Sequence, residues 1–176
     1  MTPSFRSTTL RPFSYLTLLL LGGLLGVGCE GRGTPPDVPS GQFTAYVTGA
    51  VDDTLSGTAH YRRADGALTG LELGARDGPG LSIELEPQPP ALRTYRVLEP
   101  ELFRLERPEG APAVLAFLSL EHAQFEATDG TFELTYVGED QVGATFSFQM
   151  EGHFDDGGGD DASVEVTGAV NAPSGG

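Results

Sequence analysis

The chain contains no lysine: its positive side chains are ten arginines, set against 25 acidic residues, for a formal net charge of −15 over 176 residues. Proteins that bind nucleic acids neutralise phosphates with clustered lysine and arginine, so this balance excludes nucleic acid as a partner. The same charge repels anionic lipid surfaces. An excess of carboxylates keeps a domain soluble, most of all at high salt, where its self-repulsion is screened.

Cysteine is almost absent too, since Cys29 is the only one, and it directly follows an apolar run from Phe13 to Gly28. Arg6 and Arg11 precede that run. A basic segment followed by an apolar one is typical of a secretory signal peptide. Glycines interrupt the run before it reaches the roughly 20 apolar residues of a transmembrane helix. We therefore expect residues 1–28 to be cleaved and the remainder to be exported.

The segment Leu24–Cys29, LLGVGC, resembles the lipobox of bacterial lipoproteins, although Gly26 stands where that motif usually has leucine. The resemblance implies cleavage before Cys29, attachment of a diacylglycerol to its sulfur, and acylation of the new amino terminus by a fatty acid such as palmitate. An ordinary signal peptidase site would cut the same bond without adding lipid. Two or more acyl chains hold a protein stably on a membrane. We expect a lipoprotein of the bacterial cell envelope, on its periplasmic or surface face.

Two further parts follow the leader. Residues 29–41 hold the lipidated cysteine and a segment rich in glycine and proline, which predicts a tether. Residues 42–176 then contain enough apolar residues for one core and form the predicted domain.

Apolar and polar residues alternate with period two along most of that domain, which is typical of half-buried strands. Predicted strands cover 43–51, 55–61, 67–73, 81–85, 95–98, 114–120, 124–127, 131–137, 144–151 and 163–170. Two-residue turns are predicted at Asp65–Gly66 and at Asp129–Gly130, and Pro87 is expected to end a strand. The stretch 100–109 is predicted to be non-helical. The expected fold is all-β, a single antiparallel β-barrel or β-sandwich of about 8–10 strands.

The pentapeptide VTGAV occurs twice, at Val47–Val51 and Val166–Val170. A tandem repeat is excluded because no regular unit lies between the copies. Two explanations stay open. The match is a coincidence of composition, or the first and last strands lie side by side and close the sheet, with their glycines marking a bulge or bend.

The end of the chain, with GATFSF at 143–148 and VEVTGAV at 164–170, resembles the C-terminal signature of some small β-rich bacterial lipoproteins. In that signature a GTFSF-like strand precedes a VxVTNGxF-like strand. The resemblance implies architecture and envelope location, and no activity.

Candidate sites are few. Asp155, Asp156, Asp160 and Asp161 surround three glycines and offer the oxygen ligands that calcium prefers, although their spacing differs from an EF-hand loop and a solvated hairpin loop is the alternative. His60, His122 and His153 lack the spacing of a zinc motif. Neither a GxSxG motif nor a paired set of catalytic carboxylates is present, so we expect no enzyme activity and no cofactor beyond that calcium.

The first functional hypothesis is therefore a non-catalytic β-domain that binds a small ligand or an envelope partner while a lipid holds it to the membrane. The second is a structural component of an envelope complex, recruited through an exposed strand edge. A hydrolase is the third. Five phenylalanines are expected in the core rather than in a pocket: Phe43, Phe117, Phe132, Phe146 and Phe148.

Overall fold

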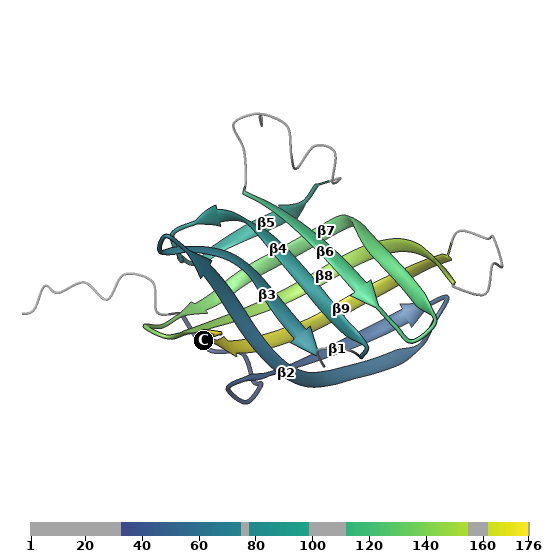
Figure 1. The fold of residues 1–176 in the computed structure, drawn as a ribbon, viewed down its shortest axis with the longest axis horizontal. Helices are drawn as coiled ribbons and strands as arrows, with labels where there is room; N and C mark the ends of the chain where they lie inside the picture. The colour runs from purple at the N-terminus through teal and green to yellow at the C-terminus, as the bar shows by residue number, and fades with distance from the viewer. Residues whose placement is uncertain (1–32, 75–77, 99–111, 155–161, 176) are drawn as a thin grey trace, which may run out of the picture. The chain divides into compact units, whose positions relative to one another are not determined.

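Nine strands make up the part of the chain that the structure describes. In a computed structural model those residues are 33–74, 78–98, 112–154 and 162–175, and they contain no helix. The strands are β1 (Gln42–Gly49), β2 (Asp53–Ala64), β3 (Ala67–Gly74), β4 (Gly80–Gln88), β5 (Arg93–Val97), β6 (Ala113–Ser119), β7 (Ala123–Val137), β8 (Gln141–Phe154) and β9 (Ala162–Pro173) (Figure 1). The predicted all-β class is confirmed. The stretch 100–109 lies outside the described residues.

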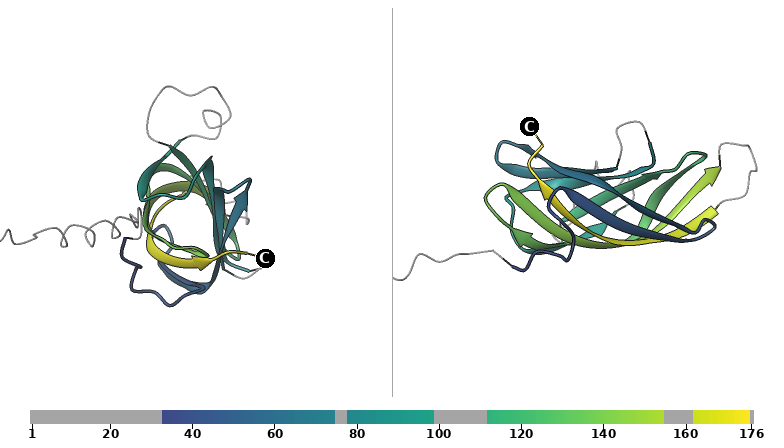
Figure 2. Two further views of the ribbon diagram at one scale, coloured as in Figure 1. Left: turned by 90° about the vertical axis from the view of Figure 1, so that its left-hand side faces the viewer. Right: turned by 90° about the horizontal axis from the view of Figure 1, so that it is seen from below.

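The nine strands form one sheet that closes into a ring, in the order β1-β2-β3-β4-β6-β5-β7-β8-β9 (Figure 2). Only β5 departs from chain order. It runs parallel to β6 and antiparallel to β7, whereas every other neighbouring pair is antiparallel. Since β7 also pairs directly with β6 nearer its start, β5 fills the wedge where those two strands diverge. The expectation of a wholly antiparallel sheet is wrong at this one pair.

The repeated VTGAV segments lie at the seam of the ring. β1 pairs with β9 from Gln42 opposite Asn171 to Gly49 opposite Val164, and Val47 lies directly opposite Val166. The closing-seam interpretation is confirmed. The bulge expected at these glycines is absent from the β1–β9 ladder, because its register runs without a shift. Gly168 instead leaves space, since a Cβ there would stand 2.6 Å from the Phe146 ring and would also overlap the Thr44 carbonyl oxygen.

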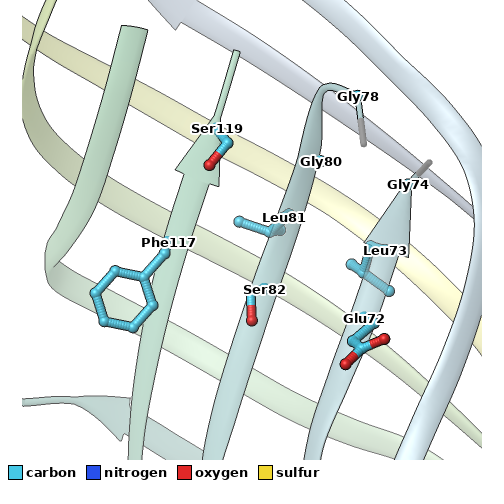
Figure 3. A pocket seen from close by; sticks show the side chains of 9 residues that line it. All are labelled: Glu72, Leu73, Gly74, Gly78, Gly80, Leu81, Ser82, Phe117 and Ser119. Carbon is cyan, nitrogen blue, oxygen red and sulfur yellow. The ribbon is translucent and has the colours of Figure 1, made fainter. Parts of the chain in front are cut away.

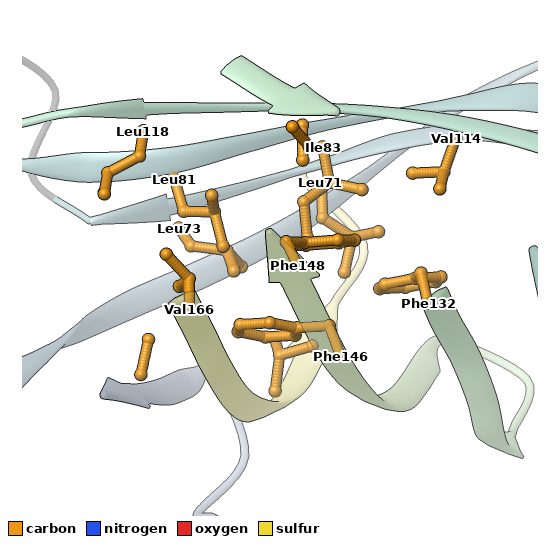
Figure 4. Packing of buried hydrophobic residues seen from close by; sticks show 14 of the residues in the cluster. Leu71, Leu73, Leu81, Ile83, Val114, Leu118, Phe132, Phe146, Phe148 and Val166 are labelled. Carbon is orange, nitrogen blue, oxygen red and sulfur yellow. The ribbon is translucent and has the colours of Figure 1, made fainter. Parts of the chain in front are cut away.

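The core fills the inside of the ring with alternate side chains from every strand. Phe146 and Phe148 stack with ring centroids 5.5 Å apart (Figure 4). Tyr95 meets Phe132 edge to face at 5.9 Å. Aromatic pairs in these arrangements add stabilisation beyond the area they bury. Four of the five phenylalanines expected in the core are there, and the exception is Phe117, which is only partly buried.

Of the two predicted Asp-Gly turns, one is confirmed and the other is wrong. Asp65 and Gly66, both with positive φ, join β2 to β3 as the predicted two-residue turn. Asp129 and Gly130 instead lie inside β7, which runs as one strand where a hairpin was predicted. Because β8 pairs with β7 along its whole length, the glycine is accommodated as a register shift near Ala127.

Proline is also tolerated within a strand. Pro87 was expected to end a strand, yet β4 continues through it to Gln88. The pairing of β4 with β6 stops at Leu85, and its pairing with β3 shifts register between Glu84 and Gln88. Proline has no backbone N–H, and the ladder needs none from it at such a position.

The end of the ring where β1 begins is held by Asn171, the one buried polar residue of the described chain. Its amide nitrogen donates to the Val38 carbonyl at 2.9 Å, its own carbonyl accepts from Gly41 N–H at 2.7 Å, and Gln141 donates to its side-chain oxygen. Pro36 packs closely on Gly143. Residues 33–41, the last part of the predicted tether, therefore lie against the strands.

The seam generates the first prediction. Gly168→Ala places a methyl group against the Thr44 carbonyl and the Phe146 ring, so we expect the free energy of unfolding to fall by about 1–3 kcal/mol, as in overpacked cores. Urea denaturation measures this. Gly57→Ala on β2 is the matched control, because its nearest atom is 3.4 Å away, and its stability should change by less than about 0.5 kcal/mol. Equal effects of the two changes would contradict the packing described at the seam.

Candidate ligand-binding groove

The two sites with the most direct sequence signals lie outside the described residues. They are Cys29, the predicted lipid attachment point, and the calcium loop of Asp155, Asp156, Asp160 and Asp161. Both stay predictions.

The histidines do not meet. His60 is exposed on β2, His153 is exposed near the end of β8, and His122 lies in the β6–β7 turn beside Glu121 at 3.8 Å. Over the described ranges, no three side chains of His, Cys, Asp or Glu are close enough together to hold a metal ion.

The arginines are dispersed in the same way. Arg62 stands 3.7 Å from Glu72 in an exposed pair, and such pairs contribute little to stability. Arg63 lies over the Tyr61 ring at 4.9 Å, and Arg93 donates to Gln88 at 3.4 Å. Each of these three described arginines therefore has a contact of its own.

A groove lies on β3, β4 and β6, where glycines bring two strands close together. A Cβ on Gly80 would stand 2.6 Å from the Leu73 carbonyl oxygen, and one on Gly74 would stand 2.7 Å from that of Pro79. Without side chains at these points, the surface is hollowed to a volume of about 480 Å³. The groove is lined by Glu72, Leu73, Gly74, Gly78, Gly80, Leu81, Ser82, Phe117 and Ser119 (Figure 3).

Phe117 is the aromatic side chain of this groove. Along β6, Val114, Ala116 and Leu118 are buried in the core, so the alternation of a strand turns Phe117 to the outer face. Its neighbour across β4 is Ser82. On the outer wall, this large apolar ring therefore has Ser82 across from it on β4, and Leu115 and Ser119 before and after it along β6.

A row of polar side chains continues on both sides of that ring. Glu72 pairs with Ser82, Ser82 with Phe117, and Phe117 with Glu126. Directly opposite side chains lie about 4.5–5.5 Å apart at Cβ, so the three members of this row that line the groove, Glu72, Ser82 and Phe117, can contact one molecule together. Within the groove, this row offers one carboxylate as a hydrogen-bond acceptor, a hydroxyl that donates and accepts, and one aromatic face.

A second hollow of about 270 Å³ lies where the β1–β2, β3–β4 and β6–β7 turns meet the end of β8. Val51, Leu120 and Phe154 line it and also pack on the core, and Phe154 meets Phe125 edge to face at 6.2 Å. This hollow is therefore largely apolar and continuous with the edge of the core.

Two tyrosines inside the ring have buried hydroxyl groups. Tyr61 and Tyr95 have no exposed surface, and neither hydroxyl has a hydrogen-bond partner. Burial raises the pKa of Tyr95, while the nearby Arg93 guanidinium acts in the opposite direction. Burying an unpaired hydroxyl costs about 1–3 kcal/mol, so each of these two groups lowers the free energy of unfolding.

Sequence reasoning missed the groove. It grouped Phe117 with the core because 114–120 is a continuous apolar run, predicted to be covered on both faces. That prediction holds from Val114 to Ala116, all buried, and fails at Phe117, which is only partly buried. The sequence did hold a signal, because side chains alternate between the two faces of a strand. If Ala116 and Leu118 face the core, Phe117 between them faces outward.

No family model, curated protein or solved structure matches this chain. Within the described ranges, no helix is long and apolar enough to cross a membrane.

Tyr95 generates the second prediction. Tyr95→Phe removes an unpaired buried hydroxyl, so we expect the free energy of unfolding at pH 7 to rise by about 1 kcal/mol. The exposed Tyr46→Phe is the control and should change nothing measurable. Urea denaturation checks both, and a loss of stability in Tyr95→Phe would show that the hydroxyl has a partner in solution.

The same residue predicts a pH dependence. Because the folded-state pKa is raised above 10.0, the unfolded chain loses this proton first, and stability falls as pH rises from about 10 toward the folded pKa. The absence of lysine leaves few other side chains titrating there. Tyr95→Phe should flatten the alkaline decline in stability, and an unchanged decline would contradict the assignment.

Proposed function

We propose that this protein is a lipid-anchored, non-catalytic binding protein of the bacterial cell envelope. Cys29 carries the lipid, the segment behind it links that lipid to the β-domain, and the groove around Phe117 receives a small ligand or a segment of an envelope partner. The observation that carries the binding role is the groove itself, which combines an aromatic ring, hydroxyls and a carboxylate over a surface that glycines leave free of side chains.

The proposal includes a β-barrel rather than a sandwich. Each of the nine strands has a hydrogen-bonded neighbour on both sides, and the inward side chains form a single cluster. A barrel of about eight strands is just wide enough for its own side chains to fill it. The cluster of buried residues supports a filled interior, which favours the outer wall as the place for a ligand.

The alternative role, assembly through an exposed strand edge, loses its main support among the described strands, because the ring pairs them all. The groove favours a binding role over that alternative. No arrangement in the groove favours a hydrolase, since Glu72 is its single carboxylate.

Metabolic labelling tests the anchor. When the full chain is expressed in a bacterium with an alkyne-labelled palmitate, we expect the wild type to be labelled and to sediment with membranes. Cys29→Ala should lose both label and membrane association. Thr34→Ala, an exposed change in the tether, is the control and should behave as the wild type does. A processed but unlabelled wild type would contradict the anchor.

A further inference from the structure

The groove also indicates the chemical class of its ligand, an inference that rests on the binding role proposed above. Its lining residues combine one partly buried aromatic ring, two serine hydroxyls and one exposed carboxylate. With a net charge of −15 and no lysine, the protein as a whole disfavours phosphates, sulfates and other anions, while Arg62, 3.7 Å from Glu72, offsets part of that carboxylate's charge at the groove. The ligand is then neutral or cationic.

The spacing of the polar groups separates these two cases. Glu72 lies two strands from Phe117, with Ser82 between them. Neighbouring strands are 4.7–4.9 Å apart, so roughly 10 Å separates the carboxylate from the ring. A single ammonium group cannot contact both. Glu126, the carboxylate next to the ring, is not part of the groove lining.

We propose that the groove binds an uncharged saccharide, with one sugar ring over Phe117 and neighbouring hydroxyls bonded to Ser82 and Glu72. A sugar ring has a face of C–H groups and an edge of hydroxyls. The C–H face suits the negative face of an aromatic ring, and the hydroxyl edge donates to a carboxylate and exchanges hydrogen bonds with serine. A molecule of one or two sugar units spans the distance from Phe117 to Glu72.

The dimensions agree with this ligand. A volume of about 480 Å³ falls within the range of small-molecule sites, roughly 300–1,000 Å³. Close packing of backbone at Gly74 and Gly80 keeps the floor free of side chains, so a flat ring can approach. Ser119, two residues beyond Phe117 and so on the same face of β6, provides a further hydroxyl at the end of the groove.

The absence of tryptophan allows a direct test. Phe117→Trp creates a single fluorescent reporter in the groove, and Tyr46→Trp creates one on an exposed site outside it. Each protein is titrated with maltohexaose, cellohexaose and chitohexaose, and separately with spermidine. We expect at least one saccharide to shift or quench the emission of Phe117→Trp and not that of Tyr46→Trp. Adding Glu72→Gln to the reporter should weaken binding about tenfold.

Because the Phe117→Trp reporter could fold poorly, saccharide binding is also measured by titration calorimetry on proteins without a tryptophan. The same saccharide should bind the wild type and Tyr46→Leu alike and should lose its affinity for Phe117→Leu. A response to spermidine with none to the saccharides would overturn the saccharide class. No response to any of the four probes would also overturn it.

Acrylamide quenching distinguishes an incorrect ligand class from a groove that is not open in solution. If acrylamide quenches the Trp at position 117 to a degree between that of Tyr46→Trp and that of a core reporter, Phe148→Trp, the groove is open in solution. A reporter as shielded as Phe148→Trp would contradict the proposed binding role as well as the ligand class.

Discussion

Pairing of the first strand with the last is the constraint on which this fold depends. Every strand has apolar side chains on one face that need a dry interior, and a single open sheet of nine strands would leave that apolar face in water. The β1–β9 ladder removes both edges at once and turns every apolar face inward. The small residues of VTGAV suit that position, because Gly168 gives room to the Phe146 ring against the neighbouring backbone.

Closure also explains why the candidate site is on the outside. The inward positions are filled by Phe43, Phe132, Phe146, Phe148 and their neighbours, so the candidate groove lies on the outer wall. There, strand alternation exposes Phe117 among polar side chains, and the glycines of β3 and β4 open a groove beside it. Together with the high negative charge and the proposed lipid anchor, this groove supports our proposal of an envelope protein that binds uncharged ligands.

Local patterns predicted much of this fold. Alternation in 144–151 and 163–170 identified β8 and β9 and their inward faces, and Asp65–Gly66 identified a hairpin turn. The repeated VTGAV suggested the contact between β1 and β9, but other contacts between distant segments were not predictable. The place of β5 depends on how β6 and β7 diverge, and the role of Asp129–Gly130 depends on the length of β8 opposite. Phe117 was hidden because a continuous apolar run does not mark which side chains face outward.

The ring can be tested most directly at its seam. Nuclear Overhauser contacts between the backbones of β1 and β9, measured on the isotope-labelled mature chain, report whether the two strands pair. Closure predicts cross-strand contacts around the opposed Val47 and Val166, with slow amide exchange in both strands. Absence of those contacts, with fast exchange along β1 and β9, would contradict the closed ring.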